Sequence, residues 1–411
     1  MISGIIFLIC IILFLIDKFE PSLVALAGCV SMVALNCCSV EEAFGGFTND
    51  IIYIVLGTEI LGVACQKCGL ANWVSEKISK CSMHKIVLIL GVGAAMLSAF
   101  INNQVVASMV LIICIAVANN NKKVNVKVIT LPVIYAVILG GQCTLIGAPA
   151  TIVSATISKE LSGYSLSMFS MAPMGIVILL IGIFYLCMFG MNKGEKLFEN
   201  KNTLEKEEIE LVKGDPKKMI VTLIAVLVMV LLFFTGAVSV GMASMIAAII
   251  CLFFRVVDTK LAYQKIDWNI IIWLGCSVGM ANALNKSGII NSAVNKLYES
   301  TQIKINPILL LIIFVLFTTI LSNFVANTTT VLMVLPVAIS IVNQYEYNVE
   351  PYVIAITMAA GLSVLTPLSC GFIGMTMRLG YKFKDYVKYG LKFQMLLTSL
   401  VVILSCAMYK F

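Results

Sequence analysis

Two polar motifs interrupt two of the longest apolar segments of the chain. Asn102-Asn103-Gln104 stands near the middle of residues 86–118, and Ala326-Asn327-Thr328 stands near the middle of residues 307–342. Bare amides are costly in hydrocarbon, and such residues usually face a protein interior or a cavity. Helix ends at such motifs offer N–H groups to anions and carbonyl oxygens to cations, and amide and hydroxyl side chains can bind Na⁺. Alternatively, these residues only satisfy a helix break, but the recurrence of the motif favours a binding site.

A second pair of motifs follows the first pair along the chain. Thr144-Leu145-Ile146-Gly147-Ala148-Pro149 lies in the apolar run after the first interruption, and Leu365-Thr366-Pro367 lies in the run after the second. Proline removes a helix hydrogen bond, so both spans are predicted to be unwound in the middle. The offsets between paired motifs stay within 217 to 224 residues. The sequence therefore predicts two copies of one unit, an arrangement typical of many secondary transporters.

Glu59 is the one acidic residue well inside a predicted span. Two interpretations stay open: a proton or cation site, or a carboxyl group that faces a polar cavity or is hydrogen-bonded to a neighbouring helix. No catalytic residue is predicted, because an intramembrane enzyme needs a nucleophile with a base, paired aspartates or a metal cluster. The single histidine, His84, lies in a predicted loop. A channel is a further alternative, but two offset hairpins favour alternating access over a continuous pore.

The composition indicates an all-α polytopic membrane protein. Apolar residues make up 60% of the chain and charged residues 12%, which is too little polar surface for a soluble body of 411 residues. A span needs about 20 apolar residues. Residues 86–118 and 307–342 are too long for one span, and the polar break in each predicts a re-entrant helical hairpin. The net charge of +7 comes from lysines that flank the spans, so neither nucleic acid nor a cofactor is predicted as a partner.

The domain organisation follows from the two copies. The first repeat is residues 1–190, with hairpin 86–118 and broken helix 128–157. The second repeat is residues 219–411, with hairpin 307–342 and broken helix 352–377, and residues 191–218 form a linker. Each repeat has about five transmembrane helices besides its hairpin, and this odd number predicts that the second repeat is inverted.

The basic residues predict the orientation. One set of alternate loops holds 23 lysine and arginine residues and the other set holds 5. The positive-inside rule then places both termini outside the cell and the linker in the cytoplasm. We expect an integral protein of a bacterial cytoplasmic membrane.

At these motifs the chain resembles the divalent-anion:sodium symporters, the sodium-coupled sulfate and dicarboxylate carriers of the ion-transporter superfamily. That family has a Ser-Asn-Thr signature at each hairpin tip and a proline-containing unwound helix after each hairpin. Here Asn102 and Ala326 replace the two serines, and Gln104 replaces one threonine.

The resemblance implies a set of binding residues. Those that would border the substrate are Asn102, Asn103, Pro149, Asn327, Thr328 and Pro367. One Na⁺ would be held by Asn103, Gln104 and Gly147, and a second by Asn327, Thr328 and Thr366. The resemblance also implies a homodimer in which the hairpins and broken helices slide like an elevator against a scaffold of the earlier spans.

The expected function is sodium-coupled uptake of a small anion, such as a dicarboxylate, sulfate or a similar oxyanion. The expected partners are that anion, sodium ions and the lipid bilayer. The alternative is an anion exporter or a sodium/proton antiporter of the same superfamily. The altered tip signatures and Glu59 both favour the alternative.

Overall fold

The computed structural model describes residues 2–16, 19–121, 123–198, 215–287, 306–367 and 369–411. Over these residues the chain consists of helices and their connections, with no strand. Six of the described helical stretches are long and apolar enough to cross a membrane: Val40–Lys67, Asn103–Asn120, Ala172–Phe198, Pro216–Thr235, Asn327–Gln344 and Phe383–Met408. The prediction of an all-α polytopic membrane protein is confirmed.

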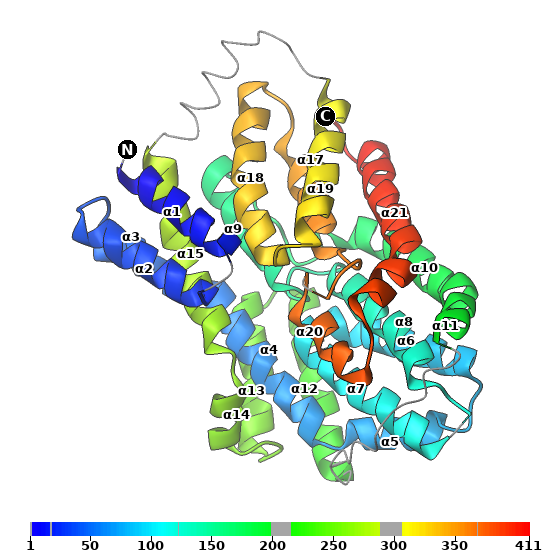
Figure 1. The fold of residues 1–411 in the computed structure, drawn as a ribbon. Helices are drawn as coiled ribbons and strands as arrows, with labels where there is room; N and C mark the ends of the chain where they lie inside the picture. Colours follow the sequence, from blue (N-terminus) through cyan, green and yellow to red (C-terminus); the bar gives the residue numbers. More distant parts are fainter. Residues whose placement is uncertain (1, 17–18, 122, 199–214, 288–305, 368) are drawn as a thin grey trace.

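The first half of the chain begins with α1 (Ile2–Ile16), α2 (Pro21–Ala34), α3 (Val40–Phe44), the 3₁₀-helix η1 (Gly45–Thr48), α4 (Asp50–Lys67) and α5 (Leu70–Ile78). It continues with α6 (Met83–Ser98), α7 (Asn103–Asn120), α8 (Val126–Gly141), α9 (Pro149–Ser162), α10 (Ala172–Tyr185), the π-helical turn η2 (Leu186–Gly190) and α11 (Met191–Phe198). Figure 1 shows the whole arrangement.

The second half begins with α12 (Pro216–Thr235), α13 (Val240–Phe253), α14 (Thr259–Lys265) and α15 (Trp268–Ser287). It continues with α17 (Pro307–Ser322), α18 (Asn327–Gln344), α19 (Val349–Gly361), α20 (Gly371–Gly374), the 3₁₀-helix η3 (Met375–Leu379) and α21 (Phe383–Met408). The predicted linker 191–218 is helical at its start, in α11, and residues 199–214 lie outside the described part of the chain.

Both long apolar runs consist of two helices joined at the polar motif. α6 and α7 contact each other and are joined by residues 99–102, while α17 and α18 contact each other and are joined by residues 323–326. These hairpins extend a few residues beyond the predicted 86–118 and 307–342. Proline is the first residue of α17. It costs no hydrogen bond there, because the first N–H groups of a helix have no acceptor within the helix.

Both predicted broken helices are interrupted, but they differ in their second halves. α8 ends at Gly141 and α9 begins at Pro149, so that two long helices flank residues 142–148. α19 ends at Gly361, and only the short α20 and η3 follow the second interruption. The second broken helix also begins at Val349, slightly before the predicted residue 352.

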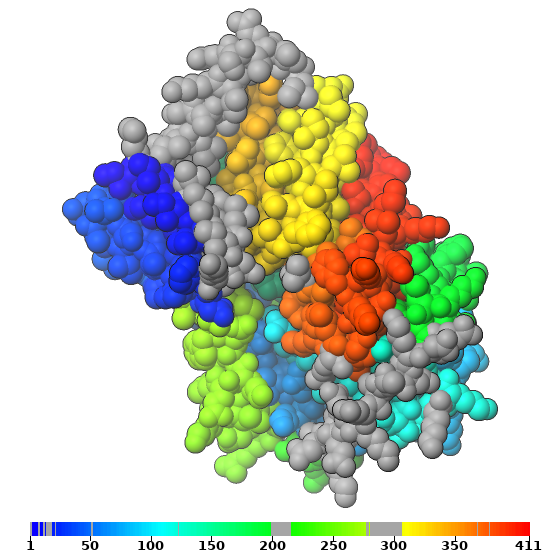
Figure 2. All heavy atoms as spheres, viewed as in Figure 1, coloured from blue at the N-terminus to red at the C-terminus, as the bar shows by residue number. Residues whose placement is uncertain are grey.

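The helices pack in two groups. α2 packs on α15, and α4 packs on α13, which also packs on α12. The hairpins and broken helices form the other group, in which α6 and α7 pack on α8, α18 packs on α9, and α17 packs on α19. On the face drawn in Figure 2, blue N-terminal residues and yellow-to-red C-terminal residues occupy different sides.

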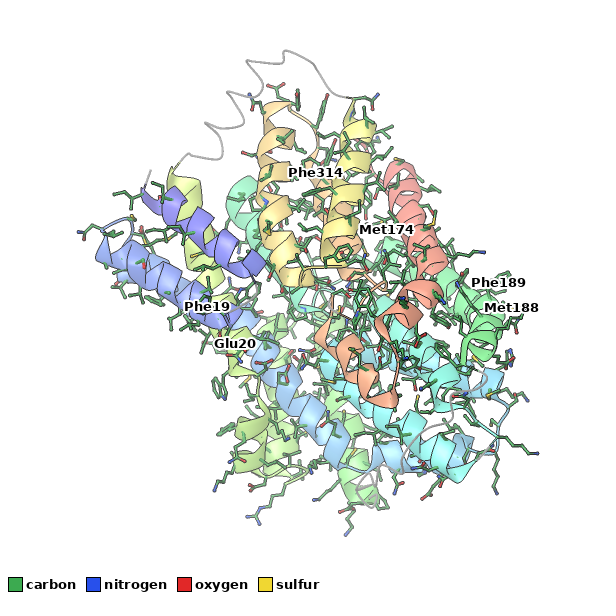
Figure 3. All side chains as sticks on the ribbon, in the orientation of Figure 1. Phe19, Glu20, Met174, Met188, Phe189 and Phe314 are labelled. Atoms are coloured by element: carbon green, nitrogen blue, oxygen red, sulfur yellow. The ribbon has the colours of Figure 1, made fainter. Side chains whose placement is uncertain are left out.

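Apolar side chains also cover much of the outer surface. On α12 the exposed residues Ile220, Leu223, Leu227 and Leu231 recur every three or four positions and form one stripe. Met188 and Phe189 are exposed as well, at the outer edge of the molecule in Figure 3. Exposed apolar area of this extent fits contact with lipid rather than with water.

The two ends of the molecule carry different parts of the chain. Both termini lie near the top in Figure 1, whereas α5 and α14 lie at the bottom. The loops around α5 and α14 belong to the set that is rich in lysine and arginine.

Candidate functional site

A pocket of about 230 Å³ lies where the two hairpin tips meet. The first tip contributes Asn102, Asn103 and Gln104, and the second contributes Ala326, Asn327, Thr328 and Thr329. Two motifs that are 224 residues apart in the sequence therefore share one cavity. Residues from the broken helices complete this side of the wall, and they are Ala148, Pro149, Ala150, Gly361, Ser369, Cys370, Gly371 and Phe372.

Three helix N-termini converge on this pocket. The first residues of α7, α9 and α18 all line it, namely Asn103, Pro149 and Asn327. The N-terminus of a helix carries about half a positive charge and points N–H groups outward, so it favours anions. No charged side chain is among the lining residues that the structure describes. The described lining therefore offers an anion backbone N–H groups and neutral polar side chains.

The first tip is held by Asn102, which caps α7. Its side-chain oxygen accepts a hydrogen bond from the Gln104 N–H at 2.9 Å, and its Nδ2 donates to Glu59 Oε1 at 2.7 Å. Glu59 is buried in α4 and does not line the pocket. The structure shows the hydrogen bond to the neighbouring hairpin tip, and a proton or cation site at Glu59 stays a prediction.

Asn103 joins the first tip to the first broken helix. Its backbone N–H donates to the Gly147 carbonyl at 3.1 Å, and its Oδ1 accepts a hydrogen bond from Ser98. The Thr144 hydroxyl donates to the Ala99 carbonyl at the end of α6. Asn103 packs closely on the end of α8, because a Cβ built on Gly141 would lie 2.1 Å from Asn103 Oδ1.

Asn327 joins the second tip to the second broken helix. Its Oδ1 accepts a hydrogen bond from Ser363 Oγ at 2.8 Å, and its Nδ2 donates to Cys370 Sγ at 3.1 Å. The Thr366 hydroxyl donates to the Asn323 carbonyl at the end of α17. The last contact repeats the bond between Thr144 and Ala99 in the first half.

Two buried amides stabilise the unwound segment after α19. Asn323 Oδ1 accepts from the Leu365 N–H at 2.8 Å, and Gln394 Oε1 accepts from the Val364 N–H at 2.9 Å. Both side chains are nearly inaccessible to solvent. They replace the helix hydrogen bonds that residues 364 and 365 lack, since a buried N–H without a partner is costly.

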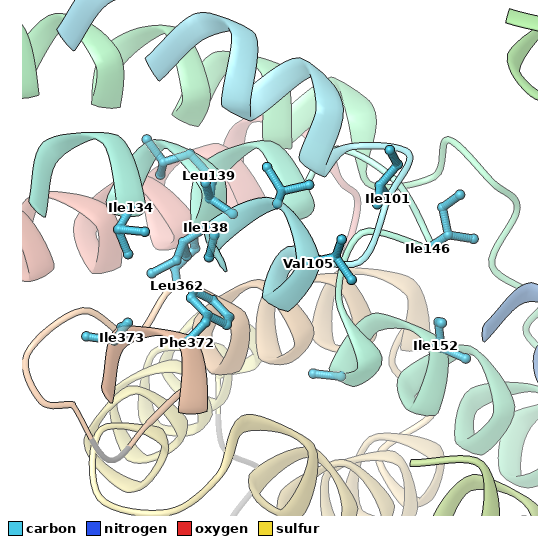
Figure 4. Close-up of a cluster of buried hydrophobic side chains, with 14 of the residues drawn as sticks. Ile101, Val105, Ile134, Ile138, Leu139, Ile146, Ile152, Leu362, Phe372 and Ile373 are labelled. Carbon is cyan, nitrogen blue, oxygen red and sulfur yellow. The ribbon is translucent and has the colours of Figure 1, made fainter. Parts of the chain in front are cut away.

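An apolar cluster lies between the two interruptions and beneath the tips (Figure 4). It joins Ile101 of the first tip, Ile138 of α8, Leu362 of the second interruption and Phe372 of α20. The two interruptions are therefore joined by packed apolar side chains.

The predicted residues occupy three kinds of position. Those that line the pocket are Asn102, Asn103, Gln104, Pro149, Asn327 and Thr328. Gly147 and Thr366 lie behind the wall, each bonded to a hairpin tip. Pro367 is buried and does not line the pocket.

One side of the pocket was not expected from the motifs. Ser22 of α2 and Asn269, Ile270 and Trp273 of α15 also line it. Asn269 and Trp273 are four residues apart and share one helix face. A polar residue and a tryptophan at that spacing, in a predicted span, is a signal that the sequence does contain.

Comparisons with known proteins identify the family. The profile of the family described as citrate transporter (CitMHS) matches residues 11–361, with a second match over residues 301–409. The sodium-dependent dicarboxylate transporter SdcS of Staphylococcus saprophyticus is 24% identical over 372 residues, which cover 80% of this chain and 70% of that protein. SdcS of Staphylococcus aureus (strain USA300) is 26% identical over 369 residues, again 80% of this chain and 70% of that protein.

Other similarities are shorter or concern the fold alone. The uncharacterized transporter sll0640 of Synechocystis is 24% identical over 179 residues, and the match spans only 29% of that protein's length. The crystal structure of the YdaH transporter from Alcanivorax borkumensis superposes with a TM-score of 0.67 and covers 95% of this chain and 98% of that chain, at 13% identity. The predicted resemblance to sodium-coupled anion carriers is confirmed, as is the prediction that the protein is a transporter and not an enzyme. With a profile match that covers most of its length, the chain belongs to the citrate transporter (CitMHS) family.

Proposed function

We propose that this protein imports a small di- or tricarboxylate into the cell together with sodium ions. The observation that carries the proposal is the convergence of the α7, α9 and α18 N-termini on one pocket without charged side chains. Such a site attracts an anion and yet leaves the empty carrier without a buried charge. The relatives named sodium-dependent dicarboxylate transporters support both the class of anion and the coupling ion.

The coupling follows from the membrane potential. An inside-negative potential opposes anion entry by about 2.3 kcal/mol per charge per 100 mV. A dianion faces about twice that opposition on the same scale. Uptake therefore requires that more positive charges enter than the anion carries, and sodium ions bound next to the anion supply them.

The sodium ions are assigned to the two joints between tips and broken helices. Asn103, Gln104 and Gly147 provide amide and carbonyl oxygens at the first joint, and Asn327, Thr328 and Thr366 do so at the second. Oxygen donors without full charge suit a monovalent cation that must also be released. The contacts of Asn103 with Gly147 and of Thr366 with Asn323 support this placement, because each ties a tip to its interruption.

The motion is an elevator in a homodimer of two inverted repeats. The two packing groups support it, since the hairpins and broken helices pack mainly on each other. In this proposal both termini lie outside the cell and the linker lies in the cytoplasm. The position of both termini at the end of the molecule opposite α5 and α14 supports that orientation.

Transport by purified protein in liposomes tests the proposal. We expect accumulation of radiolabelled succinate or citrate under an inward sodium gradient, and none when potassium replaces sodium. A shift in melting temperature with the same anion, seen only in sodium, identifies substrate and coupling ion together, because a ligand at about 100 times its Kd stabilises by about 2.7 kcal/mol. Liposomes that take up neither anion nor sulfate under a sodium gradient contradict the proposal.

A sodium/proton antiporter is the second candidate, and the buried Glu59 carboxyl next to the first tip favours it. In that case sodium addition changes the lumenal pH without any anion, and Glu59→Gln abolishes the change. If the protein is a carboxylate importer, Glu59→Gln retains sodium-driven uptake, because the glutamine Oε1 still accepts the hydrogen bond from Asn102.

A further inference from the structure

α4 connects the two packing groups of helices beside the first hairpin. It packs on α12, α13 and α15, which belong to one group, and it also contacts α7, the second arm of the first hairpin. In the proposed motion the hairpins slide against the other group, so the contacts between α4 and this hairpin must break. The side chains at this interface therefore determine how firmly the carrier is held in the arrangement that the structure shows.

Two hydrogen bonds cross this interface. Asn102 Nδ2 donates to Glu59 Oε1 at 2.7 Å, and Gln66 Nε2 donates to Ser108 Oγ at 2.8 Å. The Ser108 hydroxyl donates in turn to the Val105 carbonyl at 2.8 Å, so its oxygen serves as the acceptor for Gln66. Glu59 and Gln66 are seven residues apart, which is about two turns of α4, and they lie on one face of that helix.

Gly62 lies between these two residues on the same face of α4. A Cβ built on Gly62 would lie 2.4 Å from Val105 Cγ1, so the Val105 side chain occupies the space that a larger residue would need. Residues three and four apart are neighbours on a helix surface, so Gly62 forms a notch between the long side chains of Glu59 and Gln66. A slide along α4 would move Val105 out of this notch.

The three contacts occur in the same order along both partners. On α4 they are at residues 59, 62 and 66, and on the hairpin they are at residues 102, 105 and 108. Each contact is about one helix turn from the next, so the two surfaces match in register. A slide of one turn, about 5.4 Å, would separate all three pairs at once.

We infer that these three contacts, named the α4–hairpin lock, hold the carrier in the arrangement that the structure shows and must open before the hairpins slide. The inference rests on the proposed function. It deepens that function, because it assigns control of the transport rate to Gln66 and Ser108, which are not among the pocket-lining residues. Asn102 belongs both to the lock and to the pocket wall, so the lock lies directly beside the binding site.

The test removes the hydrogen bond between Gln66 and Ser108. Gln66→Met keeps the length of the side chain and removes the N–H group, while Ser108→Ala removes the acceptor. The bond stabilises the closed lock but is already broken when the hairpin slides, so its loss lowers the barrier to sliding. We expect each variant to exchange succinate across the liposome membrane about fivefold faster than the unmodified protein, which is about 1 kcal/mol at 1.4 kcal/mol per tenfold.

The double variant shows whether both residues act through one bond. Two substitutions that remove the same hydrogen bond are not additive. We therefore expect Gln66→Met/Ser108→Ala to exchange succinate no faster than either single variant, whereas independent effects would multiply to about 25-fold.

Ser154→Ala is the matched control. The hydroxyl groups of Ser154 and Thr357 are hydrogen-bonded to each other, and both residues are buried. They join α9 to α19, two halves of the broken helices that belong to the same group as the hairpins. The same substitution thus removes a bond that sliding does not break, and we expect an unchanged exchange rate. Melting temperatures without ligand show whether each variant is folded, and either lock variant serves if the other is not.

The outcomes separate the two proposals. If the unmodified protein exchanges succinate and both lock variants keep its rate, the inference is overturned and the proposed function stands. If Ser154→Ala accelerates exchange as much as Ser108→Ala does, or if the two lock substitutions add, then the effect is a general loosening and the inference is again overturned. If the unmodified protein transports no carboxylate at all, the proposed function fails and the inference fails with it.

Discussion

The two hairpin tips have similar sequences but are stabilised in different ways. At the first tip Asn102 caps α7 and is itself bonded to the buried Glu59. At the second tip the equivalent position is Ala326, and α18 has no side-chain cap. The first α7 N–H groups are therefore partly occupied by protein, whereas those of α18 remain available to a ligand. We infer that the first tip mainly fixes the geometry and that the second tip mainly binds the anion.

The two interruptions also differ in how closely their glycines are packed. A Cβ on Gly147 would lie 2.4 Å from the Gly141 carbonyl and 2.6 Å from the Ser98 carbonyl. A Cβ on Gly371, at the start of α20, would meet nothing within 4 Å. The backbone is close-packed at Gly147, whereas the start of α20 at Gly371 has room. Such a difference suits a carrier in which the first interruption is rigid and the second one adapts to the bound anion.

The largest effect is expected from Gly147→Ala. The added methyl group would overlap backbone atoms on two sides, which cannot rotate away as a flexible side chain can. We expect a loss of about 3 kcal/mol or more of stability, measured as yield and melting temperature of the purified protein. Gly371→Ala is the matched control and should change the melting temperature little. If both variants had the same melting temperature, the backbone at Gly147 would not be more closely packed than at Gly371.

The second largest effect is expected from Asn102→Ala. It removes the cap of α7 and leaves the Glu59 carboxyl without this donor, which together cost about 2–4 kcal/mol of unfolding free energy. Asn102→Ser keeps an N-cap group, but its side chain is too short to reach Glu59. Its melting temperature should therefore lie between those of Asn102→Ala and the unmodified protein. If Asn102→Ala melts as the unmodified protein does, then the first tip is no more constrained than the second, where alanine already occupies this position.

A smaller effect is expected from Ala326→Asn. The backbone at this position has φ −53° and ψ 138°, which an N-cap residue can adopt. The new side chain should stabilise the ligand-free protein by about 1 kcal/mol and compete with the anion for the α18 N–H groups. We therefore expect a higher melting temperature together with a several-fold weaker succinate affinity, measured on the same preparation. An unchanged affinity would mean that the anion does not use the α18 N-terminus.

The sequence predicts where the long apolar runs are interrupted, and the structure has a helix end at each of these places. Several of the predicted binding residues also line the pocket. Long apolar runs with polar centres have few solutions in a membrane, because backbone groups must be satisfied internally. The two prolines of the paired motifs hold different positions in the structure, and Pro367 does not line the pocket. Pro149 is the first residue of α9, but the corresponding helix in the second half begins at Gly371, four residues after Pro367.

The side of the pocket formed by α15 could not be predicted from a repeat. Asn269 and Trp273 reach the pocket only through tertiary packing. Their four-residue spacing places them on one helix face, but it does not indicate which cavity that face lines. The same holds for Gln394, whose amide stabilises an interruption 30 residues earlier in the chain. Local sequence patterns indicate where a helix ends, but they do not indicate which distant side chain satisfies the backbone at that end.

The smallest effects concern the contact that both halves share. The hydroxyl groups of Thr144 and Thr366 each donate to the carbonyl at the end of the preceding hairpin arm. We expect Thr144→Val and Thr366→Val each to cost about 1 kcal/mol of unfolding free energy, the usual contribution of one hydrogen bond. The control is Thr318→Val, because the Thr318 hydroxyl donates to the Phe314 carbonyl within α17, and the loss of that bond should be nearly neutral. If one of the two valine variants loses much more unfolding free energy than the other, the two halves differ at the joint between tip and broken helix. The asymmetry of the site then begins at this joint and not at the helix caps.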